Sequence, residues 1–501
     1  MGKMGADFLG HTRPTTRSRA GAMVNQTFEE LDTLLAGFDQ QQLLGCWDQL
    51  DDSQRSELAA QITSIDFEQL TRLLADEDNS ADLPEPNFTP PPAIRLHQPR
   101  AENLPSESIE QAIEIGEAAL CAGRVAMILV AGGQGTRLGL PAPKGLLPLG
   151  SVSSRTLLQF SIDRLRAISD RYQSDIPLLI MTSPAVHEAT IRFLEQHDYF
   201  GLAEENCRLF CQGTMPVADM ESGKLLLETA GSLATSPDGH GGMVEALDRS
   251  GCLADLARRQ IDVVFYAQVD NPLAQVCDPG LIGFHLAAQS EMTSQVVEKK
   301  DELEKTGNIV AVDGHLEVIE YSELPESLAH HTLPDGTLRF WAGSIAVHVF
   351  SRELLDKASR QLGWLPFHKA SKQVAFVDSS GRRQEPAGLN ALKFERFVFD
   401  LLPRADNALV VEVDRAEAFA PVKNPDQSDT DTAATAQQAL LSLHRQWLLD
   451  AGVKIDEDVP IEIHPSWAIT RQDVLNRGDL PTVIDRPTLL SADDEPGDTQ
   501  D

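Results

Sequence analysis

Between about residue 106 and residue 270 the chain alternates amphipathic stretches with short apolar runs, and this alternation restricts the fold more than any other feature. The apolar runs have the length and composition of buried strands: Val125–Ala131, Pro177–Thr182 and Asp262–Val269, with a shorter one at Arg208–Cys211. Helices are predicted at Ile109–Ala122, Arg155–Ile168 and Val186–His197. Such alternation predicts an α/β domain with a mostly parallel sheet and helices on both of its faces.

Further along the chain the predicted strands follow one another closely, which indicates an antiparallel extension of the same sheet. These strands are expected at Ser294–Glu298, Gly307–Val312, His315–Glu320 and Leu338–His348. A helix at Asn390–Leu402 and a strand at Ala408–Val413 are predicted next. Helix Ala434–Ala451 and short strands near Val459–Ile463 predict a small C-terminal α+β unit.

Composition predicts five regions. We expect a disordered leader over 1–26, a helical segment ending in a Pro-rich strap over 27–105, and the central α/β domain over 106–405. The C-terminal unit then covers 406–490 and an acidic, disordered tail covers 491–501. Within the helical segment, apolar residues recur at three- and four-residue spacings, and Asp66 is a plausible helix N-cap.

Charge and composition exclude several classes of protein. The 76 acidic residues outnumber the 42 basic ones, so the net charge of −34 argues against binding to nucleic acid or to an anionic membrane surface. The longest apolar run, Val125–Ala131, is far short of the roughly 20 residues that span a bilayer. Six cysteines in 501 residues are too sparse for a disulfide scaffold, so we expect reduced core thiols and a cytosolic protein.

A glycine-rich loop after the first apolar run carries the strongest functional signal. The sequence Leu129-Val-Ala-Gly-Gly-Gln-Gly-Thr-Arg-Leu-Gly-Leu-Pro-Ala-Pro-Lys-Gly145 places three glycines within four positions and ends on Pro-Lys-Gly. Closely spaced glycines let backbone N–H groups approach phosphates. The loop is not a dinucleotide fingerprint, because position 138 is leucine, and it is not a P-loop, because Lys144 precedes glycine.

This loop resembles the signature of the sugar-nucleotide pyrophosphorylases, and of the eukaryotic-type UDP-N-acetylglucosamine and UDP-glucose enzymes in particular. Further blocks that resemble the family follow in the family's order across about residues 30 to 455. They are Gln212-Gly213, Pro237-Asp-Gly-His-Gly-Gly242, Gln268-Val-Asp-Asn271, Val297-Val-Glu-Lys299, Glu320-Tyr-Ser-Glu323, Phe340-x-Ala-Gly343, Lys393-Phe-Glu-Arg-Phe-Val-Phe-Asp400 and Pro421-Val-Lys-Asn424. The resemblance implies a Rossmann-like nucleotidyltransferase domain over 106–405.

The resemblance also implies a reaction: UTP and a sugar 1-phosphate give a UDP-sugar and pyrophosphate. Such chemistry needs positioning and charge stabilisation around phosphorus rather than a protein nucleophile. The implied catalytic residues are Arg137, Lys144, Lys423 and Asp270. Asp270 ends an apolar strand, where α/β sheets bind ligands, and is expected to hold Mg²⁺.

Two further groups of residues are implied for the substrates. The UTP-binding residues are expected to be Val130, Ala131, Gly132, Gly133, Lys144, Gln212, Gly239, Asp270 and Lys393, with the Gln212 amide pairing with uracil. The sugar-phosphate residues are expected to be His240, Gly307, Glu320, Tyr321, Ser344 and Lys423.

The sequence leaves the sugar open. The acetylglucosamine branch of the family has Asn where this chain has His240 and Ser344, and Gly-His-Gly is more typical of the UDP-glucose branch. The other C-terminal blocks resemble the acetylglucosamine branch, so N-acetylglucosamine 1-phosphate is the favoured substrate and glucose 1-phosphate the alternative. A non-catalytic nucleotide-binding protein and a dinucleotide-dependent oxidoreductase are the competing hypotheses from other classes.

Overall fold

The computed structural model describes residues 26–75, 87–98, 104–321, 323–361 and 363–492. The chain divides into two compact units, each assembled from separate stretches. The larger unit takes Asp78–Met215, Ser236–Ala370 and Lys393–Asp501, and the smaller takes Met1–Glu77, Pro216–Thr235 and Ser371–Leu392. The two units are defined by contacts between residues, whereas the five regions were expected from composition. The division therefore does not test the five regions, which remain predictions. The expected leader up to residue 25, residues 76–86 and 99–103 of the strap, and residues 493–501 of the tail lie outside the described residues.

The described part of the larger unit is built on a ten-stranded mixed sheet. Its main path runs β1 (Phe88–Thr89), β12 (Asn308–Val312), β14 (Ala342–Ser351), β10 (Val263–Gln268), β2 (Val125–Val130), β3 (Leu178–Thr182) and β4 (Cys207–Cys211). Off this path, β11 (Met292–Glu298) pairs with β14 and β19 (Ala408–Glu412), and β13 (His315–Ile319) pairs with β12. The neighbours from β10 to β4 are parallel, whereas β14, β12, β13 and β1 pair antiparallel, as predicted.

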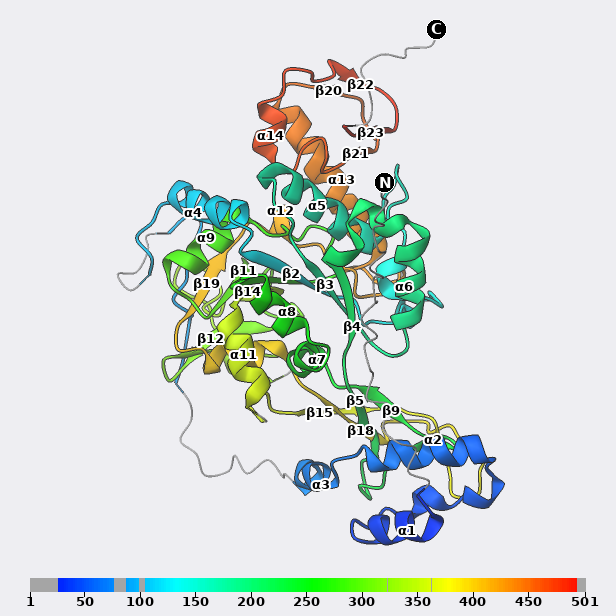
Figure 1. Ribbon diagram of the computed structural model, residues 1–501. Helices are drawn as coiled ribbons and strands as arrows, with labels where there is room; N and C mark the ends of the chain where they lie inside the picture. The colour runs from blue at the N-terminus through cyan, green and yellow to red at the C-terminus, as the bar shows by residue number, and fades with distance from the viewer. Residues whose placement is uncertain (1–25, 76–86, 99–103, 322, 362, 493–501) are drawn as a thin grey trace, which may run out of the picture. The chain divides into compact units, whose positions relative to one another are not determined.

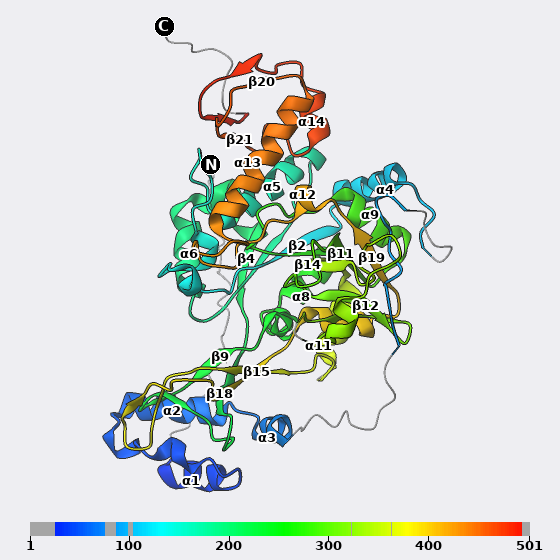
Figure 2. The same ribbon diagram turned by 180° about the vertical axis from the view of Figure 1, so that it is seen from behind.

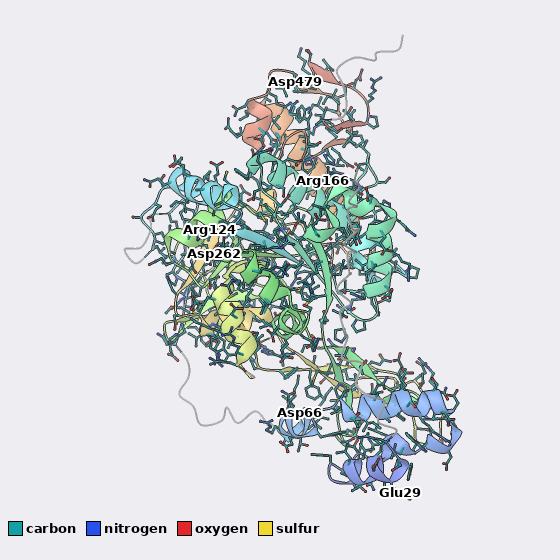
Figure 3. All side chains as sticks on the ribbon, in the orientation of Figure 1. Glu29, Asp66, Arg124, Arg166, Asp262 and Asp479 are labelled. Carbon is teal, nitrogen blue, oxygen red and sulfur yellow. The ribbon has the colours of Figure 1, made fainter. Side chains whose placement is uncertain are left out.

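Register places the ends of β2 and β10 together. Val125 pairs with Val263 and Val130 pairs with Gln268, so the two strands start and stop at the same levels. At their amino ends Arg124 and Asp262 lie side by side and form an ion pair of 2.6 Å (Figure 3). The loops that leave their carboxyl ends therefore begin next to each other.

Helices cover both faces of the sheet, because alternate side chains of β2 face opposite sides. Val125 and Met127 pack in the cluster that contains α4 (Ile109–Cys121), α5 (Leu157–Tyr172) and α9 (Pro279–Ala287). Ala126 and Ile128 pack in the cluster that contains α7 (Met243–Arg249), α8 (Cys252–Arg258) and α11 (Arg352–Arg360). Figure 1 shows the two helical layers. The predicted α/β class is confirmed.

The C-terminal stretch packs into the same apolar cluster as α4 and α5. Helix α13 (Ala433–Asp450) contributes Leu443 and Trp447 to it, and it lies beside α5 in both Figure 1 and Figure 2. Two short parallel pairs follow, β20 (Lys454–Ile455) with β22 (Val483–Ile484) and β21 (Ile461–Ile463) with β23 (Thr488–Leu490). The predicted helix and short strands are therefore present.

The smaller unit holds the predicted N-terminal helices α1 (Phe28–Ala36), α2 (Asp52–Thr63) and α3 (Phe67–Ala75). Asp66 caps α3, since its carboxylate accepts from the backbone of Gln69 at 2.8 Å. The helices pack on short strands that include β6 (Ala218–Asp219), β7 (Leu227–Thr229) and β8 (Ser232–Leu233). The amide of Gln61 accepts from the backbone of Leu233 at 2.8 Å and joins helix to strand.

One predicted helix is wrong. Residues 390–402 form strand β18 (Ala391–Glu395) and the 3₁₀ helix η8 (Val398–Arg404). Burial here has a period of two, with Phe394, Arg396 and Val398 buried and the residues between them more exposed. Aromatic residues suit that pattern.

Two composition-based expectations can be checked in the described residues. None of their helices is both long and apolar enough to cross a membrane. All six cysteines are free thiols, as predicted. They are not all in the core, however, because Cys121 is exposed and Cys211 is only partly buried. Cys121 ends helix α4, where the chain leaves the packed face.

Candidate active site

The glycine-rich loop folds back on itself after β2. The backbone N–H of Lys144 donates to the carbonyl of Gly133 at 3.0 Å, and that of Gly135 donates to Ala142 at 2.9 Å. Lys144 then begins the short 3₁₀ helix η4 (Lys144–Leu146). The loop therefore returns the lysine to the carboxyl end of β2, where the chain entered it.

Lys144 meets Asp270 at that edge of the sheet. The Nζ of Lys144 lies 3.0 Å from Oδ2 of Asp270, and the two side chains are only 17% and 14% exposed. Burial alone would raise the pKa of the Asp270 carboxyl, but Lys144 and Lys423 outweigh burial and hold the pKa below its ordinary value. The carboxylate is therefore ionised and screened by two cations.

A second segment brings Lys423 to the same place. The backbone N–H of Val422 donates to the carbonyl of Asp270 at 2.8 Å. The Asn271 side chain donates to the carbonyl of Ala418 at 2.8 Å and accepts from the backbone of Ala420 at 3.1 Å. One asparagine beside Asp270 thus fixes the segment that leads to Lys423.

Gln212 lies at the end of the neighbouring strands, against the start of the glycine loop. Its backbone N–H donates to Thr182 at 2.9 Å, and its side chain is only 7% exposed. A Cβ on Gly132 would come within 2.8 Å of Oε1 of Gln212, so a side chain there would displace the amide from this position. The structure therefore brings these two predicted uridine-binding residues together.

His240 has a fixed tautomer. Its Nδ1 accepts from the backbone N–H of Val398 at 3.1 Å, so in the neutral ring the proton is on Nε2. Burial, with the nearby charge of His368, lowers the pKa of His240 to about 4. The ring stacks on Phe397 with centroids 5.3 Å apart. His240 is therefore a neutral hydrogen-bond donor through Nε2 over the physiological pH range.

An arginine that the sequence analysis did not select holds this histidine loop. Arg396 donates to Asp238 at 2.7 Å and to Glu245 at 2.5 Å, and the backbone N–H of Gly241 donates to the Arg396 carbonyl at 2.8 Å. Both Asp238 and Arg396 lie inside blocks that resemble the family, and this position was the one feature of the sequence that could have marked them as functional. Their pairing was not visible, because they are 158 positions apart.

On the far side of β14 the structure brings together three predicted sugar-binding residues. The backbone N–H of Ser344 donates to the carbonyl of Gly307 at 2.8 Å. A Cβ on Gly307 would lie 3.8 Å from Oε1 of Glu320. Burial and the neighbouring Glu323 raise the pKa of Glu320, while Lys423 and His368 oppose that rise.

Two polar pairs near these residues were also missed. Lys299 donates to Oδ1 of Asn308 at 2.8 Å, in the interior next to Gly307. Burial lowers the pKa of Lys299 against the pull of Glu304 and other acids. His368 and Asp400, which are only partly buried, are joined at 2.9 Å, and the rings of His368 and Phe397 are tilted with their centroids 4.6 Å apart. Lys299 and Asp400 end quoted blocks, whereas His368 lies outside all of them.

Three predicted residues are not tied to these clusters. Arg137 lies exposed on the 3₁₀ helix η3 (Thr136–Leu138) and forms no hydrogen bond or ion pair with another described residue. The side chain of Lys393 is partly exposed on β18 and forms no hydrogen bond or ion pair with another described residue either. Tyr321 follows β13 with 48% of its surface exposed. The remaining predicted residues Val130, Ala131, Gly133 and Gly239 supply backbone around the glycine loop and the histidine loop.

Comparison with known proteins identifies the family. Residues 66–470 match the family model described as UTP–glucose-1-phosphate uridylyltransferase. The chain belongs to this family. It is an enzyme of the nucleotidyltransferase class, and the predicted membership in the UDP-sugar pyrophosphorylases is confirmed.

Relatives and solved structures of this uridylyltransferase agree. It is 35% identical to UDP-N-acetylhexosamine pyrophosphorylase-like protein 1 of Mus musculus, over 90% of both chains. It is 33% identical to UDP-N-acetylglucosamine pyrophosphorylase of Saccharomyces cerevisiae, over 85% of this chain and 92% of that one. The UDP-N-acetylglucosamine pyrophosphorylase of Trypanosoma brucei has the same fold, with a TM-score of 0.76 at 24% identity, covering 94% of this chain and 100% of that one.

Proposed function

We propose that this uridylyltransferase transfers UMP from UTP to N-acetylglucosamine 1-phosphate and releases pyrophosphate. The observation that carries the reaction is the cluster of Lys144, Asp270 and Lys423 at the carboxyl ends of β2 and β10. Two cations and one ionised carboxylate beside a glycine loop suit a bound polyphosphate. The names of the relatives from mouse and yeast support an N-acetylhexosamine substrate.

The proposed step is an in-line displacement at phosphorus. An oxygen of the sugar phosphate forms a bond to the α-phosphorus of UTP, while the bond from that phosphorus to the bridging oxygen of pyrophosphate breaks. Pyrophosphate leaves with the electron pair of that bond. Lys144 and Lys423 stabilise charge on the phosphoryl oxygens, and Arg137 and Lys393 are proposed to add to this field when the nucleotide is bound.

The uracil of UTP and the sugar are proposed to be bound by different parts of the site. Gln212 pairs with the uracil edge beside Gly132. On the other side, Nε2–H of His240 and the carboxylate of Glu320 bind sugar hydroxyls, and the backbone around Gly307 accommodates the acetamido group. Tyr321 is proposed to pack against the sugar ring from its exposed position.

Asp270 is the residue that would hold Mg²⁺. Magnesium in such sites takes one or two carboxylates and completes its shell with substrate phosphates and water. Among the described residues no group of three or more His, Cys, Asp or Glu side chains is arranged for a metal. A single ionised Asp270 beside phosphate-binding lysines fits the substrate-dependent kind of site. A bound Mg²⁺ would neutralise charge on the phosphates.

Metal binding can be tested without turnover. Mn²⁺ serves as a paramagnetic probe, and its bound fraction is measured with UTP present and sugar phosphate absent. Asp270→Asn should lose at least tenfold in Mn²⁺ affinity, whereas Asp458→Asn, at an exposed turn position that asparagine tolerates, should match the wild type. Equal Mn²⁺ affinity in all three proteins would contradict the assignment of Asp270.

The sugar is tested with a panel of sugar 1-phosphates and UTP, with pyrophosphate release as the readout. We expect the highest kcat/KM for N-acetylglucosamine 1-phosphate and appreciable activity on glucose 1-phosphate, since a roomy pocket discriminates weakly. The double variant His240→Asn with Ser344→Asn should raise the acetylglucosamine-to-glucose ratio. A wild-type preference for glucose 1-phosphate above about tenfold would replace the proposed substrate with the alternative.

The compartment is proposed to be the cytoplasm. The support comes from the six cysteines, all of which are free thiols. Localisation of the tagged full-length chain by microscopy tests it, and accumulation in an oxidising compartment would contradict it.

A further inference from the structure

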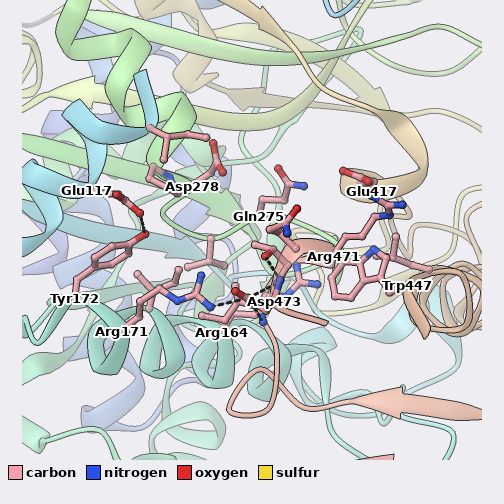
Figure 4. Close-up of a pocket in the computed structure, with 18 residues that line it drawn as sticks. Glu117, Arg164, Arg171, Tyr172, Gln275, Asp278, Glu417, Trp447, Arg471 and Asp473 are labelled. Atoms are coloured by element: carbon pink, nitrogen blue, oxygen red, sulfur yellow. Dashed lines mark hydrogen bonds and ion pairs between the residues drawn. The ribbon is translucent and has the colours of Figure 1, made fainter. Parts of the chain in front are cut away.

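Apart from the active site, the larger unit contains a cavity of about 470 Å³. Its walls come from α4, α5, the loop that follows β10, α12 (Arg415–Ala418), α13 and α14 (Arg471–Leu475). Figure 4 shows the side chains around it, with Glu117 and Tyr172 at one side and Trp447, Glu417 and Arg471 at the other. This volume lies in the range of small-molecule sites.

Two hydrogen-bond donors at the cavity have too few acceptors. Arg164 donates once, to the carbonyl of Ala274 at 2.6 Å, and no carboxylate of the described residues lies within ion-pair distance of it. Burial, with the positive charge of Arg155, lowers the pKa of Arg164 to about 10. Trp447 is only 7% exposed and its Nε1–H has no acceptor.

Arg164 and Trp447 also both border one small void, so parts of the two side chains lie near each other. A partly buried guanidinium without an anion and a buried indole N–H without an acceptor both leave bonding capacity unused. An acceptor with negative charge placed between them would satisfy both groups. Such a geometry suits a carboxylate.

The acidic side chains around the cavity are mostly engaged already. Asp473 pairs with Arg171 at 2.6 Å, Glu117 accepts from Tyr172 at 3.1 Å, and Asp278 accepts from the backbone at the start of α9 at 2.7 Å. The Glu417 side chain has no hydrogen bond or ion pair to a described residue, and burial together with Asp414 raises its pKa. The cavity therefore offers two donors, on Arg164 and Trp447, and one acceptor, on Glu417, to a ligand.

We propose that this cavity binds a small organic acid, with one carboxylate on Arg164 and Trp447 and a flat apolar body against Ile168, Val276 and Leu443. The apolar wall residues supply the burial that gives a small ligand most of its affinity. Glu417 accepts a hydrogen bond from any hydroxyl or N–H that the ligand carries at its other end.

The cavity is connected through the chain to the proposed active-site segment. Val276 follows Asp270 by six positions, and Glu417 precedes Lys423 by six. Asn271 joins the two stretches through its bonds to Ala418 and Ala420. A ligand on Val276 and Glu417 therefore contacts the two stretches that carry Asp270 and Lys423, and we expect its binding to lower kcat without competing with UTP.

Binding is tested with 2-naphthoate as the probe and 2-naphthamide as its uncharged analogue, by calorimetry on the full chain with saturating UTP. A ligand of this size should bind with a Kd below about 1 mM. The amide should bind at least tenfold more weakly, and Trp447→Phe should weaken naphthoate binding about fivefold. No binding of 2-naphthoate at 5 mM, or equal binding of the amide, would overturn the proposal.

A filling variant has a matched control on the same helix. Ile113→Trp places an indole in the cavity and should abolish naphthoate binding, whereas Ala118→Trp, at an exposed position of α4 outside the cavity wall, should leave it intact. If the two variants bound 2-naphthoate equally well, the proposed location of the binding site would be contradicted. The calorimetry does not depend on the proposed reaction, so its failure is distinguishable from failure of the proposed function.

Turnover gives the second readout and rests on the proposed function. Saturating 2-naphthoate should lower kcat at least twofold in the wild type and leave KM for UTP unchanged. Ile113→Trp should remove this inhibition. An unchanged kcat with bound naphthoate, or a rise in KM alone, would overturn the coupling to the active-site segment.

Discussion

The protonation states of the active-site side chains depend on their immediate neighbours. Asp270 stays ionised although it is largely buried, because Lys144 touches it and Lys423 faces it. Lys144 therefore has a partner before substrate arrives, and a phosphate that enters must share it. Lys423 contributes its charge to the same carboxylate without an ion pair, so both cations are available to a polyphosphate.

Removal of either lysine should reduce the rate more than the affinity. Lys144→Ala and Lys423→Ala should each lower kcat by about 100- to 1000-fold, because an oriented charge acts most strongly on the transition state. KM for UTP should rise much less. Steady-state pyrophosphate release measures both constants, with the exposed Lys454→Ala as the control. A loss below tenfold in both variants would make these lysines ordinary surface charges.

Base selection is expected to depend on one amide. Gln212→Ala should narrow the preference for UTP over CTP, because cytosine presents an unprotonated N3 and an amino group where uracil presents N–H and carbonyl. The kcat/KM ratio for the two nucleotides is the measurement, and the exposed Gln446→Ala on α13 is the control. If the wild type used both nucleotides equally well, Gln212 would not read the base.

Residues at strand ends were predictable from the sequence, and partners distant in the chain were not. Asp270 follows a buried apolar run, so its place at the sheet edge follows from the pattern alone. Lys423 was selected only through the family resemblance, since no local pattern marks it. The clamp between Asp238 and Arg396 joins segments 158 positions apart, and only tertiary packing brings them together.

At the scale of elements, α4 and α9 pack closely through two glycines. A Cβ on Gly116 would lie 1.9 Å from the carbonyl oxygen of Pro279, and a Cβ on Gly283 would lie 1.7 Å from that of Ala112. These contacts are with backbone, which cannot move aside as a flexible side chain can. The short distance between α4 and α9 therefore depends on the absence of a Cβ at both positions.

Alanine at either position should destabilise the larger unit. We expect Gly116→Ala and Gly283→Ala each to lower the free energy of unfolding by about 1–3 kcal/mol, the usual cost of overpacking. Gly478→Ala is the matched control, because nothing lies within 4 Å of its Cβ. Urea unfolding of the full chain measures the three variants. Equal midpoints for all of them would show that the helices separate without cost.

At the scale of the whole molecule, three buried histidines and the partly buried His240 make stability depend on pH. Burial lowers the pKa of His240 and His285 to about 4, and that of His348 and His444 to about 3. Below pH 6.5 the unfolded chain protonates these rings while the folded chain does not, so stability falls as pH falls. Buried carboxyls with a raised pKa, such as Asp278, act in the opposite direction.

A single variant isolates the histidine contribution. His444 accepts from the backbone of Ile463 at 3.1 Å, a bond that asparagine can also accept. Between pH 7 and pH 5, His444→Asn should lose about 2 kcal/mol less stability than the wild type. Unfolding midpoints at both pH values measure this, and the exposed His315→Gln should behave as the wild type. If all three proteins lost the same stability between pH 7 and pH 5, His444 would not be buried as a neutral ring.

The discontinuous make-up of the smaller unit has a consequence for synthesis on the ribosome. Its first helices end at Ala75, but the strands that complete the unit lie in Ser371–Leu392, roughly 300 residues later. At about 5–20 residues per second the nascent helices wait on the order of 15–60 s for those strands. During that time the contacts of the N-terminal segment with residues 371–392, such as those of Cys46 with Asp378 and Ser379, cannot form. We expect the emerging N-terminus to be a client of chaperones that act during translation.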